Sequence, residues 1–150
     1  MKAFPNLGAY EKAVGTHLGY SDWRTITQEQ VDLFADATDD HQWIHTDPER
    51  AKSGPFGAPI AHGFLTLSLI PAFLQGIYRV DGLKMIVNYG SNKVRFPRPV
   101  PVGSRIRAGA ELVGFEHVPH GVQSTVKLTV QVDGSDKPAC VAELLSLLRA

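Results

Sequence analysis

Side chains that can carry a proton are concentrated between positions 39 and 62 of the chain. They are Asp39, Asp40, His41, His45, Asp47 and His62. Asp40 and His45 lie five positions apart, a spacing that on a helix places two residues about 140° apart and on different faces. The two can therefore converge only in a loop, and a loop on a rigid scaffold is a common place for catalytic groups. An Asp and a His that contact one water can activate it as general base and return a proton as general acid.

Two other interpretations of this group stay open. Each residue taken alone is equally consistent with an ordinary polar surface, and Asp40 with the end of a helix. Asp40 and His45 together, with His62 opening an apolar segment, favour chemistry. His and Asp are acceptable metal ligands, but the H-x-x-x-H spacing of His41 and His45 does not fall on a predicted helix, and there is no cysteine pair. The sequence therefore favours an acid/base site without a metal.

Gly63 follows Ala61-His62 at the predicted start of a long apolar helix. The first N–H groups of a helix have no intrahelical acceptor, and the positive end of the helix dipole lies there. The Gly63 amide could thus donate to an oxyanion that develops during a reaction. The alternative is that this glycine only allows close packing.

The elements that must position these groups follow from capping and periodicity. Thr27, with Gln30 three residues later, forms a capping box and opens a helix whose apolar face includes Val31 and Phe34. The segment from 40 to 59 is rich in turns and holds one short helix, with Asp47 as its N-cap. A second helix is predicted from about residue 62 to residue 78. It is apolar almost all round, which indicates burial, and Pro71 predicts a kink within it.

The second half of the chain has the alternation of half-buried strands. Apolar residues occupy the even positions from 122 to 132, except Ser124, and from 106 to 112, with mostly polar residues between them. Residues 83–89 and 139–148 supply two more strands, 117–121 a loop and 133–136 a turn. A buried helix followed by long antiparallel strands is an α+β pattern. We expect the sheet to wrap round the helix.

Composition excludes several classes of protein. The chain has 150 residues, which fits one domain spanning 1–150. Lys+Arg and Asp+Glu balance at 15 each, so no overall field attracts nucleic acid or an anionic membrane. Cys140 is the only cysteine and reads as a small buried thiol in a strand, which excludes a disulfide scaffold. The beginning of the chain lacks the pattern of a signal peptide, and no apolar run can span a bilayer, so we expect a cytoplasmic protein.

Three motifs resemble those of the MaoC-like dehydratases, the (R)-specific enoyl-CoA hydratases, in the order expected for that family. The first is Phe34-Ala35-x-Ala37-Thr38-x-Asp40-x-x-x-Ile44-His45-x-Asp47. The others are Pro59-Ile60-Ala61-His62-Gly63-Phe64 and Asn92-Lys93-Val94-Arg95-Phe96-Pro97-x-Pro99-Val100-x-x-Gly103. The resemblance extends from about Trp23 to Leu147 and is also close to the short, single-hotdog hydratases of actinobacteria.

The resemblance implies a hotdog fold, a homodimer and an acyl-CoA thioester bound near the subunit interface, with no cofactor. It implies that Asp40 and His45 activate the water that adds at C3 of a trans-2-enoyl-CoA, while the Gly63 amide polarises the thioester carbonyl. It also places His62 beside the substrate. The chain departs from the usual Gly before the catalytic Asp and from the Asn-Pro after it. Asp39, Gln42 and Trp43 hold these places. The second carboxylate of Asp39 could raise the pKa of one of the two Asp residues, Gln42 could still donate to substrate, and Trp43 could line the acyl tunnel.

Lys93, Arg95 and Arg98 form the local basic cluster that a neutral protein needs for the phosphates of CoA. Ordinary solvated charges at a strand end are the equal alternative. If the strand alternates, Lys93 and Arg95 share one face while Val94 and Phe96 point into the core.

Two rival functions remain beside the hydratase. An acyl-CoA thioesterase on the same fold also needs a carboxylate and an oxyanion donor, but it does not require the paired His. A non-catalytic acyl-thioester-binding protein is the second rival, and Gln42 and Trp43 are the features that support it.

Overall fold

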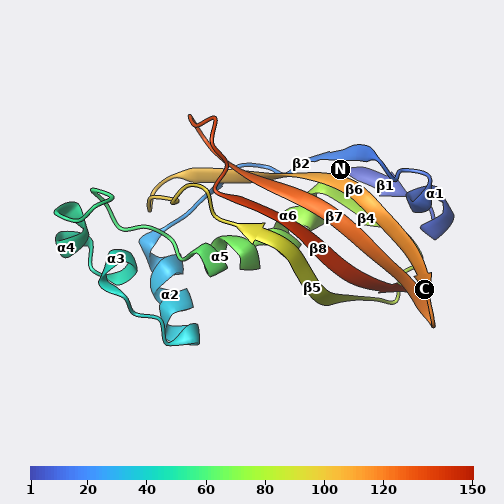
Figure 1. Ribbon diagram of the computed structural model, residues 1–150, viewed down its shortest axis with the longest axis horizontal. Helices are drawn as coiled ribbons and strands as arrows, with labels where there is room; N and C mark the ends of the chain where they lie inside the picture. Colours follow the sequence, from blue (N-terminus) through green and yellow to red (C-terminus); the bar gives the residue numbers. More distant parts are fainter.

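A curved antiparallel sheet forms the body of the molecule, which the computed structural model describes over residues 1–150 (Figure 1). Its long strands are β5 (Met85–Arg95), β6 (Arg105–Val118), β7 (Gly121–Val132) and β8 (Cys140–Arg149). With β2 (Thr16–Tyr20) the order is β2-β6-β7-β8-β5, and the short β3 (Arg24–Thr25) also pairs with β6. In the central strands Leu128 lies opposite Ala110 on β6 and Ala142 on β8. All three are buried, which confirms the predicted alternation.

Two consecutive helices lie along the concave side of this sheet, α5 (Gly63–Ser68) and α6 (Ile70–Ile77) (Figure 1). They replace the single helix predicted from 62 to 78, and the break at Leu69 confirms the kink expected from Pro71, which has no N–H to donate. Ile70, Phe73 and Ile77 are buried on α6. The α+β hotdog prediction is therefore confirmed.

The prediction that this helix is buried all round is wrong at Phe64, whose side chain is 68% exposed. The sheet covers only one side of α5, so the opposite side of that helix faces outward. The edge strand β5 is also largely exposed, with large apolar side chains at Met85, Ile86, Val87 and Tyr89. One face of the helix and one edge of the sheet are thus apolar and uncovered.

Three short elements gather beyond one end of the sheet (Figure 1). They are α2 (Gln28–Thr38), α3 (Trp43–Thr46) and α4 (Pro48–Lys52). The side chain of Thr27 accepts from the amide of Gln30, and that of Asp47 accepts from the amide of Arg50, as the predicted caps require. The α3 turn is a correction, because its segment was expected to be irregular. One turn is too short to produce a helical period in the sequence.

The N-terminal segment contains elements that the sequence did not reveal. Strand β1 (Lys2–Phe4) pairs in parallel with β4 (Tyr78–Val80), and α1 (Leu7–Glu11) follows, with Asn6 as its N-cap. Strand β1 and helix α1 have five residues or fewer, so neither produces a recognisable period in the sequence. Figure 1 places α1 at the end of the molecule opposite α3 and α4.

Strand boundaries account for the remaining corrections. The predicted loop from 117 to 121 is a tight turn, because His117 and Val118 still pair with β7. Strand β5 runs from Met85 to Arg95 instead of from 83 to 89, and its register shifts twice. The second shift lies between Asn92 and Arg95, where Lys93 has a φ of 53°. Cys140 is buried, as expected, and no helix is long and apolar enough to cross a membrane.

Candidate active site

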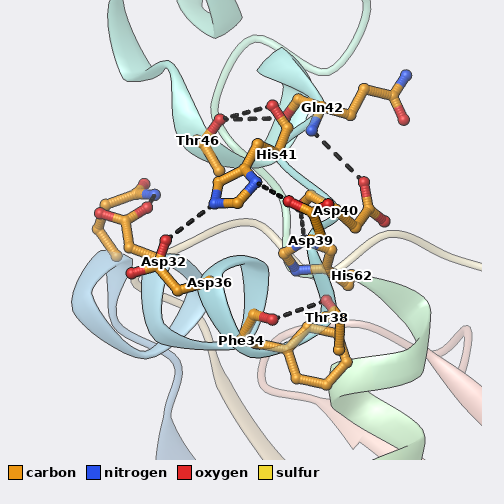
Figure 2. A network of polar contacts seen from close by, with 11 residues as sticks. Asp32, Phe34, Asp36, Thr38, Asp39, Asp40, His41, Gln42, Thr46 and His62 are labelled. Carbon is orange, nitrogen blue, oxygen red and sulfur yellow. Dashed lines mark hydrogen bonds and ion pairs between the residues drawn. The ribbon is translucent and has the colours of Figure 1, made fainter.

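The chain turns sharply after α2 and this turn carries Asp40. Asp39 caps α2 in the left-handed conformation, with φ 60° and ψ 28°. Beyond it the amide of Gln42 lies 3.4 Å from Oδ1 of Asp40, and the Asp40 side chain stays exposed. The Asp39 carboxylate does not join that of Asp40 as a second acid but lies 3.5 Å from Nδ1 of His41 (Figure 2). His41 in turn contacts Asp36 on α2 at 2.9 Å.

His45 lies on α3 and is only 7% exposed. Its Nδ1 is 2.6 Å from the carbonyl oxygen of Ile60. Because a carbonyl can only accept, the neutral ring carries its proton on Nδ1, and the Nε2 lone pair is free. Gln28 on α2 donates to the His45 carbonyl at 2.8 Å and so ties α3 to the preceding helix.

The environment of His45 favours the neutral ring. Burial is the main cause that lowers the pKa of His45 below its usual 6.5, and the neighbouring His62 lowers this pKa further. The hydrogen bond to Ile60 and the charge of Asp40 act in the opposite direction without reversing the shift. At neutral pH this side chain is therefore an uncharged base.

His62 is the N-cap of α5 and is 2% exposed. Its Nε2 lies 2.9 Å from the carbonyl oxygen of Asp40, so this nitrogen carries the proton (Figure 2). The His62 ring stacks on that of His45, with ring centroids 3.9 Å apart. The centroid of the Phe34 ring lies 4.9 Å from that of His62. The prediction places His62 beside the substrate; the structure buries it against Asp40 and His45.

Potential ligand atoms of Asp40, His45 and His62 all lie within 4.8 Å of one another. The loop thus brings together the two residues predicted to form the acid/base pair. An Asp and two His side chains are also a donor set that Zn²⁺ accepts. Since His45 Nδ1 and His62 Nε2 already face carbonyl oxygens, any such ion would be limited to the carboxylate and the two remaining nitrogens.

A pocket of about 330 Å³ adjoins His45. It is mostly apolar and is lined by His45, Phe56, Ile60, Ala61, Gly63, Thr66, Phe96, Arg98, Pro99, Val100 and Ala139. Gly63 is the first residue of α5, where a backbone N–H has no intrahelical acceptor. A Cβ at position 63 would lie 3.1 Å from the ring of Phe96, so only glycine fits without displacing that ring. Base, helix-start amide and apolar wall therefore share one cavity.

The predicted basic cluster is not assembled at this pocket. Arg98 lines the pocket and has no ion-pair partner within the chain. Lys93 lies 3.5 Å from Glu143, and Arg95 donates to the carbonyl of Val94. The expectation that Val94 and Phe96 point into the core is also wrong for Phe96, which is 41% exposed. The irregularity at Lys93 breaks the alternation on which that expectation depended.

Gln42 and Trp43 lie apart from the pocket. The Gln42 side chain is exposed and extends away from the cluster of Asp40 and His41 (Figure 2). The Trp43 ring packs under the guanidinium of Arg50 at 4.3 Å. A Cβ on Gly54 would lie 2.8 Å from the same ring. The structure thus gives Trp43 a role in joining α3 to α4, and it does not line this pocket.

Sequence reasoning missed three groups that shape the site: the Gln28 side chain, the Ile60 carbonyl and the Phe34 ring. Phe34 and Ile60 belong to the recognised motifs, so the sequence indicates that these positions matter. It does not indicate that they contact His62 and His45. Gln28 sits in the capping box, and its contact with the His45 carbonyl spans 17 positions that no local pattern connects.

Comparison with known proteins places this geometry in context. Residues 9–134 match the family model described as MaoC like domain. The chain is 60% identical over 144 residues to 3-hydroxyacyl-thioester dehydratase Z of Mycobacterium tuberculosis strain H37Rv, with 95% of each chain covered. It is 30% identical over 111 residues to an (R)-specific enoyl-CoA hydratase of Rhodospirillum rubrum, covering 74% of this chain and 73% of that protein.

A solved structure with the same fold is described as an (R)-hydratase from A. caviae involved in PHA biosynthesis. It superposes with a TM-score of 0.72 at 24% identity and covers 89% of this chain and 98% of its own. The resemblance predicted from the three motifs is confirmed by these matches.

Proposed function

Because the chain belongs to the MaoC-like family of acyl-thioester dehydratases and hydratases, we propose that it is an (R)-specific enoyl-CoA hydratase. One observation carries the proposal: a neutral His45 and the Asp40 carboxylate converge beside a pocket that also contains Gly63. The substrate class is a trans-2-enoyl-CoA, and the product is the (R)-3-hydroxyacyl-CoA.

The proposed reaction adds one water across the double bond. Asp40 and His45 hold the water, and its oxygen forms a bond to C3 as the pair accepts its proton. The electrons of the C2–C3 π bond move toward the thioester oxygen, and the Gly63 N–H stabilises the negative charge there. The pair then returns a proton to C2, so the elements of one water are added and nothing else is consumed. The reverse sequence dehydrates the hydroxyacyl thioester.

Arg98 is the group best placed for the anionic part of CoA. It is a cationic side chain on the wall of the pocket and has no acidic partner within the chain. A guanidinium forms paired, charge-assisted hydrogen bonds with phosphate. Lys93 and Arg95 lie earlier on the same segment and stay predicted phosphate contacts. Gln42 stays a predicted hydrogen-bond donor to the substrate, and Trp43 a predicted lining residue of the acyl tunnel.

A homodimer is also part of the proposal. The exposed apolar side chains of β5 lie on an edge strand, whose free N–H and C=O groups can pair with another strand. Pairing of this edge with the same edge of a second copy would cover the exposed apolar side chains of β5 in both copies. Sedimentation velocity of the purified protein tests this, and a monomer at micromolar concentration would remove the dimer from the proposal. Cytoplasmic location and a single domain over 1–150 stay predictions.

The decisive experiment mixes the protein with crotonyl-CoA and follows enoyl absorbance together with free thiol. Loss of the conjugated double bond without thiol release is the expected result, and chromatography of the product on a chiral phase should give the (R) configuration. Thiol release with the double bond retained would replace the hydratase by a thioesterase. Binding of crotonyl-CoA without either change would indicate a non-catalytic acyl-thioester-binding protein.

A further inference from the structure

The His62 ring is a buried titratable group that the proposed reaction does not use. Its Nδ1 is fully enclosed and has no hydrogen-bond partner. His62 also does not line the pocket that contains His45 and Gly63. A buried imidazole with one unpartnered nitrogen is costly, so its presence beside the catalytic pair requires an explanation.

The other nitrogen of His62 holds the main chain of Asp40. This hydrogen bond of 2.9 Å joins residues 22 positions apart and links the turn after α2 to the start of α5. The other polar contacts of the turn lie at the surface. The amide of Gln42 is 3.4 Å from the Asp40 carboxylate, and the His41–Asp36 pair is solvent exposed. The Thr46 hydroxyl donates to the carbonyls of His41 and Gln42 at 3.1 and 3.3 Å, also at the surface. His62 is thus the buried anchor of the residue that carries the proposed carboxylate.

The same ring contacts the other member of the pair. His45 and His62 stack with an interplanar angle of 26°. The plane of His45 is therefore fixed on one side by His62 and at Nδ1 by the Ile60 carbonyl. Phe34 supports His62 from α2. One side chain thereby contacts both proposed catalytic residues while staying out of the substrate pocket.

We propose that His62 is a positioning residue, whose Nε2–H fixes the main chain of Asp40, whose ring fixes the plane of His45, and which does not contact the acyl thioester. The proposal rests on the proposed hydratase reaction for its kinetic consequences, although its structural part can be tested without activity.

Two substitutions separate hydrogen bonding from packing. His62→Leu removes both the donor to Asp40 and the stacked ring. His62→Gln removes the ring but keeps an amide donor at nearly the position of Nε2. Phe34→Leu is the matched control, because it disturbs the packing on the other side of His62 and leaves the donor in place. Thermal unfolding of each variant establishes that it is folded.

We expect kcat for crotonyl-CoA hydration to fall about 100-fold in His62→Leu with KM little changed, because misplacement of the pair affects the transition state more than binding. His62→Gln should recover about tenfold of that loss, the effect of one ordinary hydrogen bond. Phe34→Leu should stay within a few-fold of the parent. An unchanged kcat in folded His62→Leu, or a rise in KM at constant kcat, would overturn the proposal and return His62 to the substrate.

An NMR titration of His45 provides a readout that a purely structural role would not move. Burial, His62, the Ile60 carbonyl and Asp40 are the influences on this ring, and His62 lowers the pKa of His45. In His62→Gln the imidazole resonance of His45 should therefore titrate at higher pH than in the parent. Identical titration in both proteins would overturn the proposal even if the parent proves inactive, and inactivity of the parent by itself would contradict only the proposed function.

Discussion

Two pairs of stacked polar rings lie at opposite ends of this molecule. His45 and His62 stack where α3 meets α5, and Tyr10 and Tyr78 stack where α1 meets β4, with ring centroids 5.4 Å apart. The histidine pair lies beside an apolar pocket. The tyrosine pair is closed by Phe4 and Phe115, and the Tyr10 hydroxyl contacts that of Tyr78 at 3.1 Å.

Burial acts on both pairs with opposite chemical results. It raises the pKa of Tyr10 and of Tyr78, since the charged form of a phenol is the deprotonated one. It lowers the pKa of His45, since the charged form of imidazole is the protonated one. At neutral pH both phenols stay protonated and inert, whereas His45 is a free base. Reactivity here thus depends on the kind of group that is buried and on a lone pair that faces a cavity.

The largest expected effect on the hydration rate comes from removing the His45 lone pair or the Asp40 carboxylate. Asp40→Asn and His45→Gln should each reduce kcat/KM for crotonyl-CoA hydration by about 10²–10⁴-fold, the usual contribution of a positioned acid or base. Circular dichroism should show an unchanged fold. Tyr10→Phe, in the inert pair, is the control and should keep the parent rate. Unchanged turnover in either site variant would remove that residue from the mechanism.

The converse test removes a ring from the inert pair. Tyr10 is fully buried, and Tyr10→Ala should lower the free energy of unfolding by about 3–5 kcal/mol, as for other large aromatic truncations. Urea denaturation measures this loss. The rate per folded molecule should stay at the parent value, because no atom of this pair reaches the pocket. A loss of rate without a loss of stability would contradict the division between the two ends.

A third test uses the pH dependence of the histidine end. His45 has a folded pKa below its unfolded value of about 6.5, so the folded state binds fewer protons than the unfolded state in the interval between them. Its contribution to stability is present above pH 6.5 and is lost as the pH falls through the lowered pKa. For the same reason kcat/KM should be constant near neutrality and should decline only below pH 6.5.

The contribution of His41 to stability changes with pH in the opposite direction and must be separated from that of His45. Its hydrogen bond to Asp36 raises the pKa of His41 above 6.5, so its contribution is present at low pH and is lost as the pH rises through the raised value. Urea titrations of the parent, His41→Gln and His45→Gln over pH 5–8 resolve the two. The acid-side loss of stability should vanish only in His45→Gln. Its persistence there would assign that loss to another group.

The sequence predicted the parts of the molecule that depend on repetition or on a local cap. The even-numbered strand positions and the caps at Thr27 and Asp47 are of this kind, and so is the break caused by Pro71. Each is decided by neighbours along the chain. The pairing of Asp40 with His45 was predicted because the spacing excluded a shared helix face.

The parts that failed depend on contacts between distant segments or on one unusual residue. The stacking of His62 on His45 joins α3 to the start of α5, and no period along the chain predicts it. Lys93 adopts a positive φ and breaks the alternation that would have placed Phe96 in the core. Asp39 is a related case, because from the sequence alone an Asp where the family usually has Gly predicts only a second carboxylate. The structure shows that the position is a left-handed cap, whose backbone an Asp can also adopt.

The smallest expected effect tests that last point. Asp39→Gly should raise the free energy of unfolding by up to about 1 kcal/mol, because a left-handed conformation is strained for a residue with a Cβ and free of strain for Gly. The hydration rate should not change, since the Asp39 carboxylate faces His41. Asp39→Ala keeps the strain without the side-chain contact and should be less stable than the parent in the same urea titration. If Asp39→Gly instead lowers kcat in a folded protein, the Asp39 carboxylate acts on Asp40 and His45. The left-handed backbone of position 39 would then not explain why this chain has Asp there.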